Sequence, residues 1–353
     1  MTIHFFTIKD KNSATARYRG YLIAEELAKR NYSVLVHPAL SQLSSANNIQ
    51  RLKKIFGYFK ILFSTKSGDI IYLVRTAYHL DFYVLTVIFK TIFKRKIIFD
   101  FDDSIFSRPG IAKRVIKLTT MADAVIVGGH YLADWAKKYN SNIHIIPTSI
   151  PFDVYSRFSR TSRPDNKKFT IGWIGTGPNN YQNLKILVPV FQKLIQDKVE
   201  FKFILIGALG DKRIYKLFRD IKNLEVELID ALDWQHTANI PKAIQQFDVG
   251  LMPLVDNDDN RGRCAFKAIE YMACSVPAIL SPVGENNYLI DDNLNGFLAG
   301  STQDWVAKIK KLQSNKDYNY DLGQISAQTV LSHYSYAANI PKIEKIIKQV
   351  LCN

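Results

Sequence analysis

The chain has 353 residues, of which 47% are hydrophobic and 22% charged. This length exceeds the size at which one core stops growing and the composition excludes a disordered chain, so we expect two globular domains. The net charge is +15, and through Ile150 there are 22 Lys and Arg against 10 Asp and Glu, an excess of 12 that predicts an anionic partner: nucleic acid, an anionic membrane or a phosphorylated substrate.

In the first half, continuous apolar runs alternate with segments of helical period. The runs predict buried strands at residues 2–8, 32–38, 69–74, 96–101, 123–129 and 142–147, and the periodic segments predict helices at 18–30, 80–93, 111–121 and 131–139. The pattern pauses in the polar stretch 157–168, which we interpret as an interdomain linker.

The same alternation restarts in the second half. Strands are predicted at 169–175, 201–207, 224–229, 249–254 and 277–283, and helices at 183–197, 212–220, 240–246 and from a start near Arg263. Apolar strands separated by helices indicate parallel sheets covered on both faces. We therefore expect two doubly wound domains, with ligands bound outside the carboxyl ends of the strands, in a cleft between the domains.

The helix predicted near Arg263 carries an unusual set of charges. Arg263, Lys267 and Glu270 are separated by four and three residues and would share one helix face, behind an acidic cap at Asp256–Asn260. Two cations at a helix start can neutralise a diphosphate, and a carboxylate one turn deeper can accept both hydroxyls of a ribose. The alternative is a solvated face with an ordinary Lys267/Glu270 pair.

Two further segments end predicted strands with polar residues. "DFDD", residues 100–103, suggests a metal ligand set, but no other ligands accompany it, so we favour a role for Asp102 or Asp103 in the crevice. "IGWIGTG" lacks the glycine spacing of a dinucleotide site. Gly175 and Thr176 can still bring backbone N–H groups to a phosphate, or form a plain strand-to-helix turn.

Many blocks resemble glycosyltransferase family 4, a family of enzymes with the GT-B fold. They include "SATARYRGYLIAEEL", "IIYLVRTAY", "IIFDFDDSIF", "ADAVIVGGHYLADWAKKY", "IGWIGTGPNNYQNLK", "FDVGLMPL" and "AFKAIEYMACSVPAILSPVGENNYLIDDNLNGFL", in the order of a bacterial subgroup. In that family two glutamates separated by seven residues hold the donor. Glu270 matches the second, whereas Gly262 occupies the place of the first.

The resemblance implies further roles. Arg263 and Lys267 would hold the diphosphate, and Asp102 and Asp103 would lie where many members carry a His near the reacting sugar. Gly284 would approach the donor sugar or simply form a turn. Arg17 and Arg19, where the family has a glycine-rich turn, are either acceptor-phosphate ligands or solvated arginines.

The basic, aromatic segment Arg51 to Lys66 allows two interpretations. It fits a helix in a membrane interface, and it equally fits a helix whose aromatic residues are core and whose lysines are exposed. The charge asymmetry of the chain favours the membrane.

We therefore predict an α/β protein of the GT-B type: an acceptor-binding domain (1–155), a nucleotide-sugar-binding domain (156–335) and a C-terminal helix (336–353) that packs back onto the first domain. It would transfer a sugar from a nucleotide diphosphate to a glycan or a lipid-diphosphate-linked acceptor, with retention, in bacterial surface-glycan synthesis. No cofactor, metal or nucleic acid is expected. A nucleotide-sugar epimerase and a non-catalytic anionic-surface or nucleic-acid binder are the alternatives.

The three cysteines include no C-x-x-C pair, and neither a signal-peptide pattern nor an apolar run of about 18 residues is present. We accordingly expect a cytoplasmic protein that contacts the inner face of the membrane.

Overall fold

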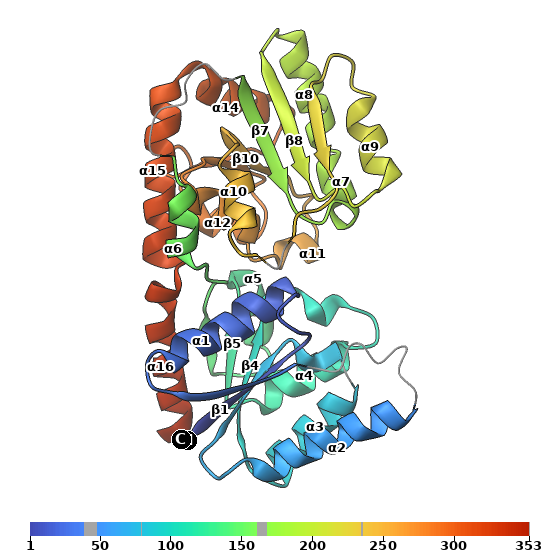
Figure 1. Cartoon of the computed structure of the whole chain (residues 1–353), viewed down its shortest axis with the longest axis vertical. Coiled ribbons are helices and arrows are strands. Elements are labelled where there is room, and N and C mark those ends of the chain that lie inside the picture. Colours follow the sequence, from blue (N-terminus) through green and yellow to red (C-terminus); the bar gives the residue numbers. More distant parts are fainter. Residues whose placement is uncertain (39–47, 79, 161–167, 234–235, 353) are drawn as a thin grey trace. The chain divides into compact units, whose positions relative to one another are not determined.

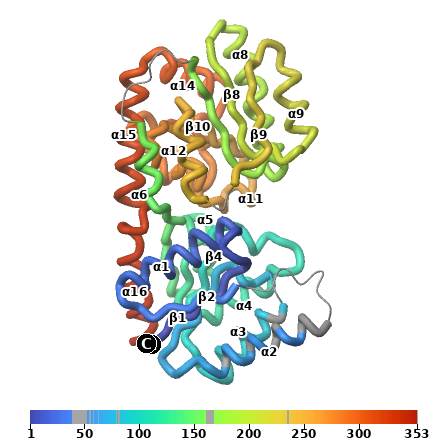
Figure 2. The backbone as a smooth tube through the Cα atoms, viewed as in Figure 1, coloured from blue at the N-terminus to red at the C-terminus, as the bar shows by residue number. Residues whose placement is uncertain are grey.

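The computed structural model describes residues 1–38, 48–78, 80–160, 168–233 and 236–352. The chain divides into two compact units (Figures 1 and 2). The first comprises Met1–Ser149, Gly262–Cys264 and Tyr336–Asn353, and the second comprises Ile150–Arg261 and Ala265–Ser335.

The first unit is built on a six-stranded sheet of order β2-β1-β3-β4-β5-β6, in which every neighbouring pair is parallel. The strands are β1 (Thr2–Thr7), β2 (Ser33–Pro38), β3 (Ile70–Val74), β4 (Lys96–Phe101), β5 (Ala124–Val127) and β6 (Ile143–Ile145). Its helices are η1 (Ala16–Tyr21), α1 (Leu22–Ala28), α2 (Asn48–Ser64), η3 (Thr76–Tyr78), α3 (Leu80–Thr91), η4 (Ile105–Ser107), α4 (Ala112–Met121), α5 (His130–Ala136) and α16 (Tyr336–Cys352).

Two apolar cores cover the faces of this sheet, as expected for strands buried on both sides. Phe99 and Phe101 belong to the core formed with α3, α4 and α5, whereas Ile98 belongs to the opposite core. That second core is completed by α16, whose Ile343 and Ile347 are buried in it. The predicted return of the C-terminal helix to the first unit is confirmed.

The second unit repeats the architecture with a parallel sheet of order β12-β11-β10-β7-β8-β9. The strands are β7 (Phe169–Ile174), β8 (Phe201–Ile206), β9 (Val226–Ile229), β10 (Val249–Met252), β11 (Ala278–Leu280) and β12 (Phe297–Leu298). The helices are α6 (Phe152–Tyr155), η5 (Ser156–Phe158), η6 (Pro178–Asn180), α7 (Tyr181–Leu184), α8 (Leu187–Gln196), α9 (Lys212–Arg219), α10 (Asn239–Ile244), α11 (Asp258–Arg261), α12 (Phe266–Ala273), α13 (Asn286–Leu289), α14 (Thr302–Ser314) and α15 (Lys316–His333).

The residues that form the two faces alternate along the central strand. Ile171 and Trp173 of β7 lie in the core packed against α8 and α14, whereas Ile174 lies in the core packed against α12. The prediction of two doubly wound parallel-sheet domains is confirmed. Most of the predicted linker, residues 161–167, lies outside the described residues.

The helix predicted to start near Arg263 was placed wrongly. The structure has two helices there, α11 and α12, and α12 begins only at Phe266. Ala265 before it adopts a left-handed backbone (φ 53°), which interrupts the helix although no glycine or proline marks the break. Arg263 therefore precedes α12 and does not share its face with Lys267 and Glu270. The acidic residues also differ from the predicted cap: Asp256 pairs with Arg261 at 2.6 Å.

Candidate functional site

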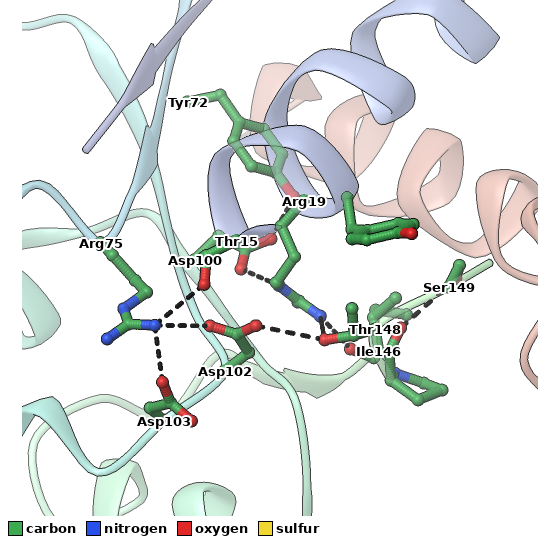
Figure 3. Close-up of polar contacts among 12 residues, drawn as sticks. Thr15, Arg19, Tyr72, Arg75, Asp100, Asp102, Asp103, Ile146, Thr148 and Ser149 are labelled. Carbon is green, nitrogen blue, oxygen red and sulfur yellow. Dashed lines mark hydrogen bonds and ion pairs between the residues drawn. The ribbon is translucent and has the colours of Figure 1, made fainter. Parts of the chain in front are cut away.

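The carboxyl ends of β3 and β4 carry a cluster of charged side chains in the first unit (Figure 3). β4 ends at Phe101, so that Asp100, Asp102 and Asp103 lie at this edge. Across from them, η1 is a π-helix that carries Arg17 and Arg19. Short π-helical segments are rare in proteins, and those that occur are often found at functional sites. The sequence pattern had indicated an ordinary α-helix at this position.

Arg19 is held by Asp100 inside the first unit. The Arg19 guanidinium is 1% exposed, and its Nε donates to Asp100 Oδ1 at 2.5 Å. Its Nη1 donates to the Ile146 carbonyl at 3.0 Å and to Thr148 Oγ1 at 3.1 Å. The other oxygen of Asp100 accepts a hydrogen bond of 2.6 Å from the Tyr72 hydroxyl.

These contacts act on the pKa values of both groups. Burial raises the pKa of Asp100, although the neighbouring Arg19 and Tyr72 oppose that rise. Burial alone would lower the pKa of Arg19, but the carboxylates of Asp100 and Asp102 outweigh it, and the pKa is raised. Arg19 thus stabilises the edge of the sheet, and its predicted contact with an acceptor stays a prediction. Arg17 is also buried, with its guanidinium 5.0 Å from the Tyr18 ring centre.

Arg75 links the remaining acidic residues. It follows β3 in a left-handed backbone conformation (φ 52°), a strained state for a side chain of this size. Its Nη1 donates to Asp103 Oδ2 at 2.6 Å and to Thr15 Oγ1 at 2.9 Å, and lies 3.5 Å from Asp102 Oδ1. Arg75 belongs to no charged motif of the sequence, and its only signal there is its position directly after a predicted strand.

Asp102 and Asp103 differ in environment. The Asp103 side chain is 38% exposed, whereas that of Asp102 is 6% exposed. Burial and the charge of Asp103 raise the pKa of Asp102 to about 6, against the effect of Arg75 and Arg19. Asp102 can therefore exchange a proton near neutral pH, which an ordinary surface carboxylate does not.

The guanidinium partners bear on the metal interpretation of "DFDD". Asp100 and Asp102 face Arg19 and Arg75, so their carboxylates already have positively charged partners within the protein. Among the described residues, no group of three His, Cys, Asp or Glu side chains has a metal-binding arrangement.

The second unit presents a different edge at the end of β7. A side chain at Gly175 would place its Cβ 2.4 Å from Lys267 Cε, and one at Gly207 would meet the Gly175 carbonyl oxygen at 1.7 Å. Gly207 therefore needs glycine, which lets the turns after β7 and β8 approach each other, whereas Gly175 favours glycine through its φ of 157°, which residues with a side chain rarely adopt. Gly175 donates its N–H to the Ile206 carbonyl at 2.9 Å. That amide is occupied, and the predicted phosphate contact of Gly175 stays a prediction.

Lys267 lies directly over this turn. It is the second residue of α12, half-buried, with its ammonium 5.7 Å from the ring centre of buried Trp173. This aromatic contact and the glycine turn hold the lysine stem at the carboxyl end of β7. The neighbouring Thr176 is exposed, and its carbonyl accepts a hydrogen bond of 2.8 Å from the Asn180 side chain.

Three buried asparagines, which sequence analysis missed, connect the loop after β7 to the loop after β10. Asn260 Nδ2 donates to Asn183 Oδ1 at 2.9 Å, and Asn183 Nδ2 lies 3.3 Å from both Asn260 Oδ1 and Asn180 Oδ1. Asn183 Oδ1 also accepts from the Val255 amide at 2.9 Å. These neutral amides fix the two loops without adding charge to the edge.

Glu270 lies one turn deeper on α12 and is 7% exposed. Its Oε1 accepts a hydrogen bond of 2.8 Å from the hydroxyl of Tyr155, a fully buried residue of α6. Tyr155 thereby fixes the orientation of the carboxylate that was predicted to hold a ribose. The pair joins residues 115 positions apart, so no local pattern could have indicated it.

The remaining predicted positions are Gly284 and Arg263. Gly284 has a left-handed backbone (φ 56°), and a Cβ there would lie 2.3 Å from the Arg261 carbonyl oxygen. The turn requires glycine, in agreement with the turn alternative, and does not test the contact with a donor sugar. Arg263 is half-buried, in the segment that precedes α12.

Comparisons with known proteins give the class. Residues 168–315 match the family model of glycosyl transferases group 1. A search of curated proteins found no match. Solved structures with the same fold include a glycosyltransferase from Rickettsia africae ESF-5 (16% identity, TM-score 0.76) and sucrose-phosphate synthase from Thermosynechococcus elongatus (14% identity, TM-score 0.76), each covering 100% of this chain and 99% of the other.

A third similar structure is Anabaena Alr3699/HepE in complex with UDP and glucose, at 15% identity and a TM-score of 0.71, with 99% of this chain and 100% of that chain covered. At these identities the structural likeness establishes the fold.

The fold is the GT-B fold of these solved structures, and the match of residues 168–315 to the glycosyl transferases group 1 indicates a glycosyltransferase. Within that class, its second unit is similar to the glycosyl transferases group 1, and the family 4-like resemblance predicted from the sequence is confirmed at this level.

Proposed function

We propose that the protein transfers a sugar from a nucleotide-diphosphate donor, bound by the second unit, to a hydroxyl of an acceptor, bound by the first. The observation that carries this proposal is the arrangement on α12, where Lys267 lies over the glycine turn of β7 and Glu270 lies one turn deeper. A cation beside a strand-to-helix turn suits a diphosphate, and an oriented carboxylate suits the two hydroxyls of a ribose. Anabaena HepE, which has the same fold, was solved with UDP and glucose.

The chemical step needs stabilisation of the leaving group. The bond between the anomeric carbon and the diphosphate oxygen breaks, the acceptor oxygen bonds to that carbon, and the acceptor proton leaves with the nucleoside diphosphate. Negative charge grows on the diphosphate in the transition state, and Lys267 together with Arg263 would stabilise it. This role of Arg263 is supported by its sequence position before α12 and by its charge.

Asp102 and Asp103 would orient the acceptor hydroxyl in the first unit. Asp103 is accessible to a ligand, and Asp102 changes its charge near neutral pH. The proposal requires no metal and no cofactor, since the lysine and arginine supply the positive charge. Arg17 and Arg19 would complete the acceptor region, Arg19 through its contact with Asp100.

Four finer features belong to the same proposal. The product would keep the anomeric configuration of the donor, as the family 4 resemblance implies. The acceptor would be a glycan or a lipid-diphosphate-linked sugar of a bacterial surface polymer. The protein would act in the cytoplasm against the inner face of the membrane, because its first 150 residues carry an excess of 12 positive charges. It would bind no nucleic acid.

Thermal-shift titration with UDP-, GDP-, ADP- and dTDP-sugars tests the donor. One nucleotide sugar should raise the melting temperature of the native protein and should not do so for Lys267→Ala. NMR of the product then gives the anomeric configuration. Consumption of the donor without any acceptor would indicate an epimerase, and the absence of stabilisation by every nucleotide sugar would refute the proposed donor.

A further inference from the structure

Helix α2 of the first unit exposes an apolar stripe. Leu52, Phe56, Phe59 and Phe63 follow one another at intervals of four, three and four residues, so they share one helix face. Their exposed fractions are 66, 74, 38 and 71%. The opposite face carries Ile61, which packs on the core of the first unit. A helix that only covers a core buries its apolar stripe and exposes its polar face. In α2 these four apolar residues are instead exposed.

The stripe continues beyond the end of α2. The Phe63 ring contacts the Phe93 ring edge-on, with 5.8 Å between the ring centres. Both sequence neighbours of Phe93 are exposed, Ile92 to 68% and Lys94 as a surface residue. Arg95 fixes this junction, since its Nε donates to Thr65 Oγ1 at 3.1 Å. Exposed apolar side chains that gather into one continuous surface mark an interaction site.

The charges beside the stripe identify the partner. Lys53 and Lys60 are both exposed and lie about a quarter turn from the phenylalanines on the helix. The sequence of α2 contains no Asp or Glu. Aromatic side chains flanked by lysines match the boundary between acyl chains and anionic headgroups, where the rings insert and the ammonium groups remain at the phosphates. Figure 1 shows α2 at the periphery of the first unit.

We propose that the α2 stripe, defined as Leu52, Phe56, Phe59 and Phe63, inserts into the interface of an anionic bilayer. The proposal deepens the membrane contact of the proposed function by naming the surface that makes it. A second copy of the chain fits less well, because a two-fold contact through α2 would bring its lysines against those of the partner. No described helix is long and apolar enough to cross a bilayer, and insertion of one helix face needs no such segment.

Vesicle flotation with the full chain tests the surface. The native protein should float with phosphatidylglycerol/phosphatidylcholine vesicles and much less with phosphatidylcholine alone. The double variant Phe56→Ser/Phe63→Ser should lower the partition coefficient at least about tenfold. Lys53→Gln/Lys60→Gln should lower it about fivefold per lysine on anionic vesicles only.

Matched controls separate the surface from general effects. Ile325→Ser/Leu331→Ser changes two exposed apolar residues of the second unit, and Lys113→Gln/Lys117→Gln removes two exposed charges from α4. Ile325→Ser/Leu331→Ser should leave the partition coefficient unchanged. Equal losses of partition in Lys113→Gln/Lys117→Gln and in Lys53→Gln/Lys60→Gln would overturn the assignment to α2. So would unchanged flotation of Phe56→Ser/Phe63→Ser, or a lipid-free dimer that this variant abolishes.

The test is independent of the proposed activity. Phe56→Ser/Phe63→Ser should bind donor nucleotide as the native chain does. Vesicle binding without any donor binding would leave the α2 assignment intact while refuting the proposed function. Donor binding without vesicle binding would refute the α2 assignment and leave the proposed sugar transfer intact.

Discussion

The two units share one architecture but build the carboxyl edges of their sheets from different chemistry. The first unit uses ion pairs, in which Arg19 and Arg75 meet the buried Asp100 and Asp102 and the more exposed Asp103. The second uses glycine turns and neutral asparagine amides, with Lys267 held over the turn of β7.

The difference shows that the fold determines where a ligand can bind, whereas the side chains at each edge determine which kind of ligand it is. Paired charges fix side chains at the cost of removing them from water, and they respond to pH. Glycines and amides bring backbone close to a ligand and leave a lysine to supply the charge. We infer that the first edge orients a neutral hydroxyl and that the second binds an anion.

Breaking the ion pair of the first unit should have the largest effect. Asp100→Asn leaves the Arg19 guanidinium buried without its counter-charge, which should reduce the free energy of unfolding by about 3–5 kcal/mol. Urea unfolding measures this. Asp134→Asn, which breaks an exposed pair with Lys137, should change stability by less than about 1 kcal/mol. Equal effects of the two substitutions would contradict the structural role of Asp100.

Removing the charge of the second edge should affect turnover and leave stability almost unchanged. Lys267→Ala should lower kcat/KM about 100- to 1,000-fold, because the ammonium group that stabilises the negative charge of the leaving diphosphate is lost. Steady-state kinetics with the donor found by thermal shift gives this value. Lys242→Ala, which removes an exposed lysine of α10, serves as the control. Similar kinetics for Lys267→Ala and the native enzyme would remove Lys267 from the site.

The pH dependence should separate the two edges. The pKa of Asp102 is about 6, above its ordinary value of 3.8, so acceptor-dependent turnover should fall about tenfold per pH unit below 6. Donor binding at the second edge should not share this fall. The acidic limb should disappear in Asp102→Asn, and a limb that persists there would show that another group titrates.

Stability responds to the same group with the opposite sign. Between pH 6 and about 4 the folded state holds a proton on Asp102 that the unfolded chain has released, so this residue favours folding as the pH falls. His37 acts the other way: burial lowers its pKa to about 4, so its contribution to stability is lost as the pH falls below 6.5. Urea unfolding of the native protein and of Asp102→Asn at several pH values isolates the contribution of Asp102 to the free energy of unfolding.

The smallest effect should come from the support of Glu270. Tyr155→Phe removes the hydrogen bond of 2.8 Å that orients the carboxylate, and should weaken donor binding about three- to tenfold with little change in kcat. Calorimetric titration measures it. Tyr215→Phe, which removes an exposed tyrosine–Asp230 hydrogen bond of 2.8 Å, should leave donor binding unchanged. A loss confined to kcat would argue against a positioning role for Tyr155.

The sheets could be predicted because their central strands, such as Ile70–Val74 and Ala124–Val127, are buried on both faces and apolar throughout, and eleven of the twelve described strands lie within the predicted ranges. The twelfth strand, Phe297–Leu298, is only two residues long and has no periodicity to detect. The start of α12 was misjudged because Ala265 adopts a conformation that its residue type disfavours.

The candidate sites were predictable only in part. Positions such as Asp102 and Lys267 could be chosen because they follow strands or begin helices. Their partners could not: Tyr72 reaches Asp100 over 28 positions and Arg19 reaches it over 81, and such contacts depend on the tertiary structure alone. The asparagine cluster had a weak signal in the amide-rich loops around Asn180 and Asn260.

The position of α16 has a consequence for biosynthesis. Ile343 and Ile347 complete a core that also contains Ile3 and Phe5, so segments far apart in the sequence are packed together. A ribosome makes residues 150–335 before it makes α16. We therefore expect that the second unit can fold during translation, whereas one face of the first unit's sheet stays uncovered until α16 has been made.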